Sequence, residues 1–494
     1  MATTTAWNSP PSPWVPPAPR HESLDDIVIG AGVVGLSAAI GLAARGRRVA
    51  VLEAATDLHS GTTARSTGKL TLLCGTLLST IERHRGQEEA QRHLDGIRQA
   101  RVQVETLLTR HAVPVERRPA VTWAAEPSQE SSVHDEYSAS RRTGLETRLT
   151  TTPPDGLPGH AAVVLDDQLQ VDPADYARAL ADEAVSCGAD LHLGQRVQHI
   201  RHHSDGGVLV STDRGLCLPC ANVVIATGLP IADRSAAFAT TRPHRSYVVA
   251  FESTGRPFTS MAVTAGSPTI SVRTARTHGG ELILVGGHGH EVGRDRTPGR
   301  HADSLRRWAS RHLEIGDEVA AWSAQDQLTP DGVPLVGKLL GRLPLYIATG
   351  FGTWGLLAGF AAGRRLADAI ADKASLPTIP TPSLLRPAEL GRILARNGAA
   401  AVELVTGWID ASIHHPTAPP AEGGSVCRAP PPTAVSTVDG RTRSVSAVCT
   451  HLGGILRWNE FEQSWDCPLH GSRFDPTGHV LEGPATRDLT PRKE

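Results

Sequence analysis

The order of apolar and polar residues predicts that the chain opens with a strand, a helix and a second strand. A short apolar run at 24–30 ends in glycine, as buried parallel strands often do, and a helical pattern follows to about Arg45. A second apolar run occupies 47–53. Together these segments predict a βαβ unit near the N-terminus.

Later segments repeat both kinds of pattern. Helices are predicted at about 80–111, 172–187 and 354–371. Strands are predicted as a hairpin over 208–218, as buried runs at 223–228 and 345–349, and as an antiparallel set between 246 and 287. The pattern therefore indicates an α/β region that also contains antiparallel sheet.

Proline-rich segments mark the predicted borders. The first 20 residues hold six prolines and no apolar core segment, which indicates a disordered leader rather than a secretory signal. Prolines gather again at 376–387 and 414–420, on either side of a predicted amphipathic helix at 393–413, whose charged residues argue against a bilayer crossing. The predicted parts are a leader (1–23), a large region (24–373), a linker with the amphipathic helix (374–420) and a small β-rich domain (421–494).

Composition adds two limits. The formal net charge is -2, with 40% apolar and 20% charged residues, which gives no overall attraction to nucleic acid or to an anionic membrane surface. A small molecule or another protein is therefore the expected partner. Seven cysteines in 494 residues do not form a disulfide scaffold, so a cytoplasmic location is expected.

A glycine-rich turn follows the first predicted strand. Residues 30–35 read GAGVVG, and Glu53 lies 18 residues after Gly35, at the end of the second strand. In a dinucleotide-binding βαβ unit, the glycines allow a tight turn, close approach of the backbone to a pyrophosphate, and close packing of the helix. The helix N-terminus attracts the phosphates, and the acidic residue accepts hydrogen bonds from a ribose. The sequence therefore predicts a dinucleotide site.

Three further segments indicate which dinucleotide binds. They read TTARSTGK at 62–69, ATG at 226–228 and GFGTWG at 350–355. With the first turn, they resemble the D-amino-acid-oxidase and glycine-oxidase superfamily of FAD enzymes over about 24–372. The resemblance implies a Rossmann-like FAD-binding domain, made from about 24–80, 160–235 and 325–373, and an antiparallel-sheet substrate domain, made from about 81–159 and 236–324.

The resemblance also implies the residues that hold FAD. The late turn would meet the isoalloxazine ring, with the positive end of the following helix near the ring edge that becomes anionic on reduction. The candidates are Gly30, Gly32, Val33, Val34, Gly35, Glu53, Thr67, Gly68, Lys69, Ala226, Thr227, Gly228, Gly350, Phe351, Gly352, Trp354 and Gly355.

Three of these assignments have alternatives. Lys69 and its neighbour Arg65 could equally be phosphate-side or surface charges, and Trp354 could equally be a core residue. The late turn also spells GxGxxG, which raises a nicotinamide site as a second possibility. No following strand with an acidic residue completes such a unit, so a separate NAD(P)H domain is not expected.

Two short loops near the C-terminus each carry one cysteine and one histidine. They read CTHLGG at 449–454 and CPLHGS at 467–472, with 15 residues between His451 and Cys467. Two thiolates on one iron and two imidazoles on the other suit a [2Fe–2S] cluster. Zinc accepts the same four ligands, but zinc motifs usually pair cysteine with cysteine and histidine with histidine. The metal-ligand candidates are Cys449, His451, Cys467 and His470.

The two loops resemble the Rieske family, and the likeness extends to residues 472–475 and 483–485. It implies a small all-β domain that holds a Rieske [2Fe–2S] cluster. Respiratory members carry two more cysteines, joined as a disulfide, where this chain has Gly454 and Leu469, and a tyrosine where it has Phe474. Hydrogen bonds to the cluster stabilise its reduced state. Because phenylalanine cannot donate the bond that the tyrosine would, we expect a reduction potential below that of the respiratory type.

Several other residues are assigned to packing or left open. Cys217 and Cys220 form a CxxC in the predicted hairpin, where packing explains them better than redox chemistry. His290 follows a glycine turn, and no carboxylate at a suitable spacing completes a mononuclear iron site with it. Arg245 or Arg273 could bind a substrate carboxylate or could lie on the surface. No catalytic residue is assigned.

These features predict an FAD-dependent oxidoreductase with a Rieske iron–sulfur centre. The superfamily resemblance implies hydride transfer from a small amine or amino acid to FAD, and the fused cluster would then receive the electrons and pass them to a further acceptor. One alternative is an electron-transfer flavoprotein that relays electrons between a partner protein and a Rieske-linked acceptor. Another is direct reaction of the flavin with oxygen. A substrate-sized pocket beside the flavin would argue against the relay.

Overall fold

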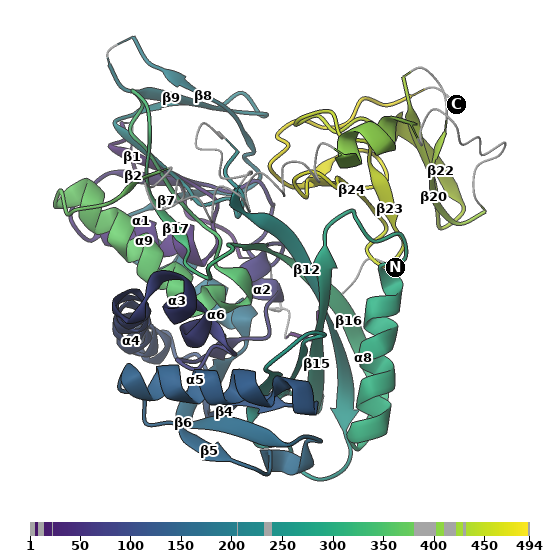
Figure 1. Cartoon of the computed structure of the whole chain (residues 1–494). Helices are drawn as coiled ribbons and strands as arrows, with labels where there is room; N and C mark the ends of the chain where they lie inside the picture. The colour runs from purple at the N-terminus through teal and green to yellow at the C-terminus, as the bar shows by residue number, and fades with distance from the viewer. Residues whose placement is uncertain are drawn as a thin grey trace.

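The computed structural model describes residues 5–7, 14–21, 23–204, 206–231, 240–379, 402–409, 421–427 and 431–492. In these parts of the chain, a large α/β body carries a small β-rich domain on one side (Figure 1). The predicted linker lies mostly outside the described residues. Of the predicted leader, residues 5–7, 14–21 and 23 are described. The prediction of disorder is wrong for this part, because the side chains of Trp7 and Trp14 are buried against the α/β body, where the Trp14 indole donates to Asp182 at 2.8 Å. Within the linker, 402–409 are helical, in agreement with the predicted amphipathic helix.

A seven-stranded sheet forms around the opening βαβ unit. Its strands are β1 (Asp26–Ile29), β2 (Val49–Leu52), β7 (Asp190–His192), β11 (Asn222–Ile225), β17 (Leu335–Leu339), β18 (Leu345–Thr349) and β19 (Thr378–Ile379). β1 pairs in parallel with β2 on one side and with β11 on the other. Every residue of β1 and β2 is buried, which explains why the sequence shows continuous apolar runs there rather than alternation.

The helices follow the predicted pattern with one break. They are α1 (Val33–Ala43), α2 (Thr62–Arg65), α3 (Leu77–Arg85), α4 (Gln87–Arg110), α5 (Glu130–Arg142), α6 (Pro173–Ser186), α8 (Gly299–His312) and α9 (Gly355–Ala371), with 3-10 turns at Pro127–Gln129, Pro154–Gly156 and Gly352–Trp354. The helix predicted at 80–111 is two helices, because Gly86 between them has a φ of 89° and a right-handed helix cannot continue through that conformation. α6 begins after Asp172, whose carboxylate accepts a hydrogen bond from the Ala174 N–H at 2.8 Å.

A second, nine-stranded sheet crosses the body. It contains β3 (Lys69–Leu70), β4 (Val115–Ala124), β5 (Arg148–Thr150), β6 (Ala161–Val171), β12 (Arg242–Ser253), β13 (Met261–Thr264), β14 (Ile270–Thr277), β15 (Gly280–Glu291) and β16 (Ile315–Leu328). Its pairs are antiparallel, as predicted, except that β13 runs parallel to β4. A separate antiparallel set is formed by β8 (Val197–His202), β9 (Val208–Thr212) and β10 (Cys217–Cys220).

The C-terminal domain contains two small antiparallel sheets. The first has β20 (Gly423–Cys427), β21 (Thr433–Val438) and β22 (Arg441–Ser446), and the second has β23 (Arg457–Asn459), β24 (Ser464–Asp466), β25 (Arg473–Phe474) and β26 (Val480–Glu482). Trp465 and Phe474 are fully buried in its core, which is separate from the cores of the α/β body. This all-β domain agrees with the predicted fold class.

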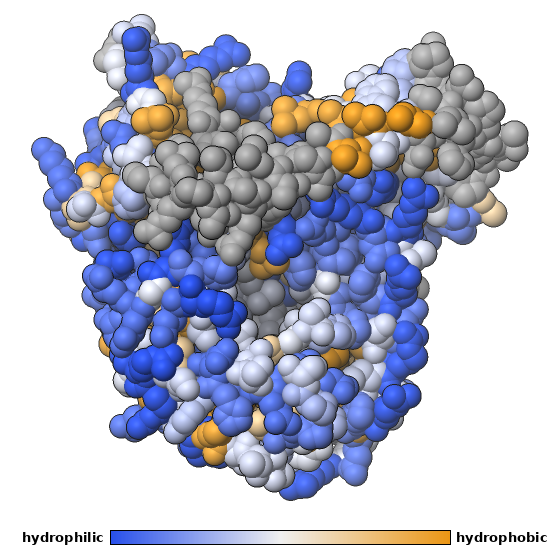
Figure 2. Space-filling view, in the orientation of Figure 1, coloured by the Kyte–Doolittle hydropathy of each residue, from blue (hydrophilic) through white to orange (hydrophobic). Residues whose placement is uncertain are grey.

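The surface is mostly hydrophilic on the face shown in Figure 2. Apolar residues gather there on the C-terminal domain, where the helix at 402–409 exposes Val402, Val405 and Ile409. In the described part of the chain, no helix has both the length and the apolar character that a membrane crossing requires.

Candidate functional site

The turn after β1 depends on its glycines. Gly30 has a φ of 102°, which other residues rarely adopt, and a Cβ there would lie 2.6 Å from the carbonyl oxygen of Ala226. A Cβ at Gly35 would lie 1.9 Å from the carbonyl oxygen of Gly30. Glycine is therefore the residue that fits at both positions, and the turn packs tightly between α1 and the end of β11.

Glu53 and Thr63 hold this turn from the side. The Glu53 carboxylate accepts hydrogen bonds from the N–H groups of Ala31, at 2.7 Å, and Ala55, at 2.9 Å. The Thr63 hydroxyl accepts one from the N–H of Val33, the first residue of α1, at 3.0 Å. The acidic residue and the TTARSTGK segment therefore meet at the same helix N-terminus.

These elements surround one cavity of about 740 Å³. Of the cofactor-binding candidates, all but Gly35 and Gly352 line it. Both glycine-rich turns therefore face a single space, which supports one dinucleotide site rather than two. Residues from the second sheet line the same cavity, among them Ser246, Val263 and Ser271.

The cavity fits FAD on two grounds. The glycines leave open a space that side chains would occupy, since even at Gly32 a Cβ would come within 3.3 Å of the Thr63 hydroxyl oxygen. The N-terminus of α1 offers backbone N–H groups, which are suitable partners for phosphates. The space continues from these turns to the second sheet.

Lys69 and Arg65 have different environments. Lys69 is buried in β3, and its ammonium donates to the carbonyl of Ala262 at 2.9 Å and to the hydroxyl of Ser271 at 2.6 Å. Burial, with a smaller effect from Arg273, lowers the pKa of Lys69 to about 7. Arg65 donates to the carbonyl of Ser323 at 3.2 Å. Lys69 is therefore not a surface charge, and it lies in the cavity wall at the second sheet.

The two cysteine–histidine loops have matching backbone geometry. In the first, the Cys449 N–H donates to the Gly454 carbonyl at 2.9 Å, and in the second, the Cys467 N–H donates to the Ser472 carbonyl at 2.8 Å. A glycine with positive φ, Gly453 at 75° in one loop and its counterpart at 77° in the other, precedes each closing residue. The loops therefore present their ligands from two similar frames.

The four ligand candidates form two pairs. The thiols of Cys449 and Cys467 are hydrogen-bonded to each other and both are buried, and the rings of His451 and His470 lie 5.2 Å apart. A thiolate pair beside an imidazole pair fits a two-iron cluster with one kind of ligand on each iron. The hydroxyl of Ser472 adds a hydrogen bond to Cys449.

Gly454 and Leu469, the two positions where respiratory relatives are expected to carry cysteines, face each other. A Cβ at Gly454 would lie 2.8 Å from the Leu469 side chain and 3.1 Å from the Cys467 sulfur. Leucine therefore fills the space between the loops. Phe474 is fully buried and has no hydroxyl to donate to the cluster.

The C-terminal domain docks against strands β12 and β16 of the second sheet. Gln325 donates a hydrogen bond to the carbonyl of Gly471 at 2.9 Å, and a Cβ at Gly471 would lie 2.5 Å from Pro243. On the other side, the Arg196 guanidinium donates to the Val480 carbonyl at 2.7 Å. Residues of the docked domain from 480 to 486 line the cavity. The cavity is therefore formed by both domains.

A buried ionic network holds this interface. The Arg245 guanidinium, which has no exposed surface, donates to Ser323 at 2.6 Å and pairs with Glu482 at 2.6 Å. Arg473 pairs with Glu482 at 3.1 Å and with Glu462 at 3.3 Å. Burial alone would raise the pKa of Glu462, but the guanidinium groups around it lower that pKa to about 2.

Replacing Arg245 with methionine should loosen this interface. The change would leave buried carboxylates with too few partners, at a cost of about 3 kcal/mol or more. We expect a lower thermal midpoint and faster proteolytic separation of the two domains. Arg306→Met, at a more exposed ion pair with Glu318, should change stability by about 1 kcal/mol or less. Equal effects of the two substitutions would contradict the role given to Arg245.

The arginines considered for substrate binding are both committed to the protein. Arg245 belongs to the network above. Arg273 is buried, and it donates to the carbonyls of Thr67 at 2.6 Å and Thr274 at 2.8 Å. Neither lies on the surface, and neither presents an unengaged guanidinium to a carboxylate. The CxxC cysteines lie on β10, with Cys217 exposed and Cys220 buried, away from both sites.

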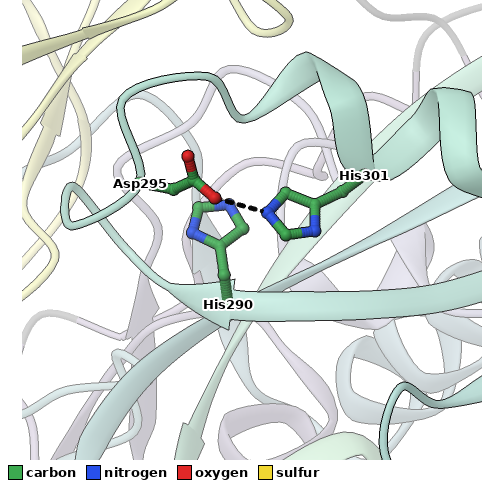
Figure 3. Close-up of side chains that lie close together, drawn as sticks. All are labelled: His290, Asp295 and His301. Carbon is green, nitrogen blue, oxygen red and sulfur yellow. Dashed lines mark hydrogen bonds and ion pairs between the residues drawn. The ribbon is translucent and has the colours of Figure 1, made fainter.

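His290 has a carboxylate neighbour that its sequence context does not reveal. Asp295 and His301 lie beside it, and Asp295 pairs with His301 at 2.7 Å (Figure 3). The two imidazole rings are stacked, with centroids 4.6 Å apart and planes only 10° from parallel. Ligand lone pairs lie in the ring plane, so stacked rings do not direct them at one ion. The Nε2 atom of His290 is instead hydrogen-bonded to the Tyr247 hydroxyl, at 2.9 Å.

Three cavity-lining residues were not identified from the sequence. His244 and Asp326 lie directly opposite each other on β12 and β16, with their side chains toward the cavity, and Glu482 reaches it from the docked domain. Alternation along a single strand does not predict how β12 and β16 pair, so it gave no sign that His244 and Asp326 share a face. No sequence signal indicates the position of Glu482.

Comparisons with known proteins agree with this division. The family model described as FAD dependent oxidoreductase matches residues 25–369, and the model of the Rieske [2Fe-2S] domain matches residues 422–491. The chain is 28% identical to YhfW of Bacillus subtilis (strain 168), whose name describes a Rieske 2Fe-2S iron-sulfur protein, over 99% of this chain and 97% of YhfW. Over 45 residues, 9% of this chain, it is 51% identical to the cytochrome b6-f complex iron-sulfur subunit 1 of Nostoc sp., of which the match covers 25%.

Solved structures resemble the α/β body. The glycine oxidase from Geobacillus kaustophilus has a TM-score of 0.59 and 23% identity, covering 72% of this chain and 96% of that one. The L-proline dehydrogenase from P. horikoshii has a TM-score of 0.58 and 21% identity, covering 72% and 95%. At these identities the likeness shows a shared fold.

Proposed function

Because the chain belongs to the family of FAD-dependent oxidoreductases and ends in a Rieske [2Fe–2S] domain, we propose that it oxidises a small amine or amino-acid substrate and delivers the electrons to its own cluster. The observation that carries this proposal is the docking of the cluster-binding loop. The loop lies against β12 and β16, two strands that also line the cavity.

Strands β12 and β16 make this connection. His244, Asp326 and Gln325 line the cavity, whereas Arg245 is paired with Glu482 of the docked domain. Gln325 is hydrogen-bonded to Gly471, the residue next to the ligand candidate His470. Gln325 therefore contacts both the cavity and the cluster loop, and a tethered acceptor at this place needs no diffusional encounter.

The chain's own residues supply the binding surfaces. Bound FAD would provide the hydride acceptor, and the cluster would provide one-electron transfer. The turns at 30–35 and 350–355 and the carboxylate of Glu53 would hold the first, and the two loops would hold the second. Lys69, whose pKa of about 7 lets it hold or release a proton near neutral pH, lies in the cavity wall at the second sheet.

The extent of the cavity favours a dehydrogenase over a relay between partner proteins. The space extends beyond the glycine turns to Ser246, Ser271 and Asp326, which a relay without a small-molecule substrate does not require. We propose that a separate protein takes the electrons from the cluster and that the chain works in the cytoplasm, as the cysteine usage predicts.

Anaerobic stopped-flow mixing tests the proposal. Small amines added to the oxidised holoprotein should bleach the flavin absorbance first and the cluster absorbance afterwards. NADH should not reduce the protein at a catalytic rate, because no second dinucleotide site accompanies the cavity in the described residues. Rapid reduction by NADH would instead favour the relay, and a cluster that stays oxidised beside a reduced flavin would exclude the internal transfer.

A further inference from the structure

Asp326 is a cavity-facing carboxylate that the protein does not neutralise. It lies on β16, directly opposite His244 on β12, and it lines the cavity. Among the described residues, no side chain or backbone group donates a hydrogen bond to its carboxylate, and no cation pairs with it within 4 Å. Asp326 is partly buried, and a carboxylate without a protein partner in a binding cavity points to a ligand.

The charges around Asp326 leave its negative charge unbalanced. Glu482, from the docked domain, also lines the cavity, but it is paired with Arg245 and Arg473. The Arg245 guanidinium lies nearby but is engaged by Ser323 and Glu482, at 2.6 Å each. Burial and Glu482 raise the pKa of Asp326 to about 7, while Arg245 opposes them. This end of the cavity therefore favours a positive ligand.

The cations of the cavity wall are directed elsewhere. In the part of the chain that the structure describes, Arg65, Lys69 and Arg196 line the cavity. Arg65 donates to the Ser323 carbonyl, Lys69 to Ala262 and Ser271, and Arg196 to the Val480 carbonyl. A substrate carboxylate would thus meet no unengaged guanidinium there and would lie close to the like charge of Asp326.

We infer that Asp326 binds the ammonium group of the substrate, and that the substrate class is amines without a carboxylate rather than amino acids. This inference rests on the proposed function and narrows it. Asp326 would attract the cation, and the apolar wall residues Val248, Val263 and Trp354 would contact its carbon skeleton.

Calorimetric titration of the oxidised holoprotein with two matched probes tests the inference. The probes are tert-butylammonium and pivalate, which have the same shape and opposite charges. Neither has a hydrogen on the carbon that bears the charged group, so neither is oxidised as an amine. We expect the cation to bind at least roughly tenfold more tightly than the anion, since an ion pair in a buried site contributes at least about 1.4 kcal/mol.

Two variants assign the effect to Asp326. Asp326→Asn, which keeps the shape of the side chain, should weaken tert-butylammonium binding by roughly tenfold or more, and Asp326→Glu should retain most of it. Asp317→Asn, at an exposed position on the same strand, should leave the affinity unchanged. Unaltered flavin and cluster spectra in the variants would show that they are folded and loaded.

The pH dependence provides a second readout. Below its pKa of about 7, Asp326 is protonated and neutral, so the affinity for the cation should rise between about pH 6 and about pH 8. The other groups that face it are Glu482, Arg245, His244 and, across the cavity, Lys69. Burial lowers the pKa of His244 to about 4, so that ring does not titrate in this range. Lys69 does titrate in this range, and its contribution remains in the Asp326→Asn variant. The part of the rise in affinity that this substitution removes is therefore the part due to Asp326.

The outcomes separate this inference from the proposed function. A cation that binds no more tightly than pivalate, or an Asp326→Asn variant with unchanged affinity, would overturn the assignment of an amine without a carboxylate. Neither result depends on electron transfer. Conversely, failure of amines to reduce the flavin, or a cluster that stays oxidised, would overturn the proposed function while leaving the measured cation site in place.

Discussion

Replacement of Cys467 by serine should remove the [2Fe–2S] cluster while FAD stays bound. Cys467 is buried, and its sulfur lies beside that of Cys449, where two thiolates are needed to hold one iron. A serine hydroxyl is a poor substitute because it stays protonated at neutral pH and binds iron weakly. The cavity that holds FAD is built mainly from the other domain, so its cofactor should be unaffected.

Metal and sulfide analysis, together with electron paramagnetic resonance of the reduced protein, would measure this loss. We expect two irons in the wild-type protein and essentially none in Cys467→Ser, with unchanged FAD content. Flavin reduction by substrate should persist, but electrons should no longer reach an external one-electron acceptor through the cluster. Cys217→Ser, at an exposed cysteine on β10, is the matched control and should keep both cofactors. Zinc in the wild-type protein would contradict the cluster assignment.

Gly35→Ala should have a comparably large effect on FAD. The added methyl group would lie 1.9 Å from the carbonyl oxygen of Gly30, and this neighbour is backbone that cannot move without displacing the turn. Since α1 also packs against α9, where a Cβ at Gly363 would already meet Ser37 at 2.0 Å, the helix has little room to retreat. We expect FAD affinity to fall by roughly 100-fold or more, equivalent to about 2.7 kcal/mol.

The FAD content after gel filtration, and the dissociation constant of the apoprotein for added FAD, would show the change. Gly96→Ala is the matched control, because Gly96 lies inside α4 with no atom within 4 Å of the added Cβ. Alanine is the better helix former, so this control should retain FAD and gain up to about 1 kcal/mol of stability. A Gly35→Ala protein that stays yellow would show that the turn is not where the dinucleotide binds.

The predictions that held from the sequence are those set by residues close together in the chain. The opening βαβ unit follows from apolar runs and a glycine turn within 24–53, and the structure has β1, α1 and β2 there. The ligand candidates of the cluster are spaced within two short loops, and these loops fold into matching turns. The one helix that was predicted too long, at 80–111, was interrupted by Gly86, whose backbone conformation the apolar period does not encode.

Other features depend on contacts between distant parts of the chain. Arg245 and Glu482 are 237 positions apart, yet their ion pair fixes the docked domain against the cavity. Even the nearby residues Asp295 and His301 meet His290 only because α8 packs back on β15, which the cysteine and histidine pattern alone gave no reason to expect.

The sequence alone determined the fold class and the two cofactors, and it predicted the ligand set, because local periodicity and motif spacing carry that information. The tertiary structure decided that the Rieske domain closes the cavity, that Arg245 and Arg273 are engaged by the protein, and that Asp326 lines the cavity without a protein partner. Which face of a strand lines a cavity, and which partner a buried charge finds, is set by how whole elements pack against one another. Those packing contacts form between residues hundreds of positions apart, so no local pattern records them.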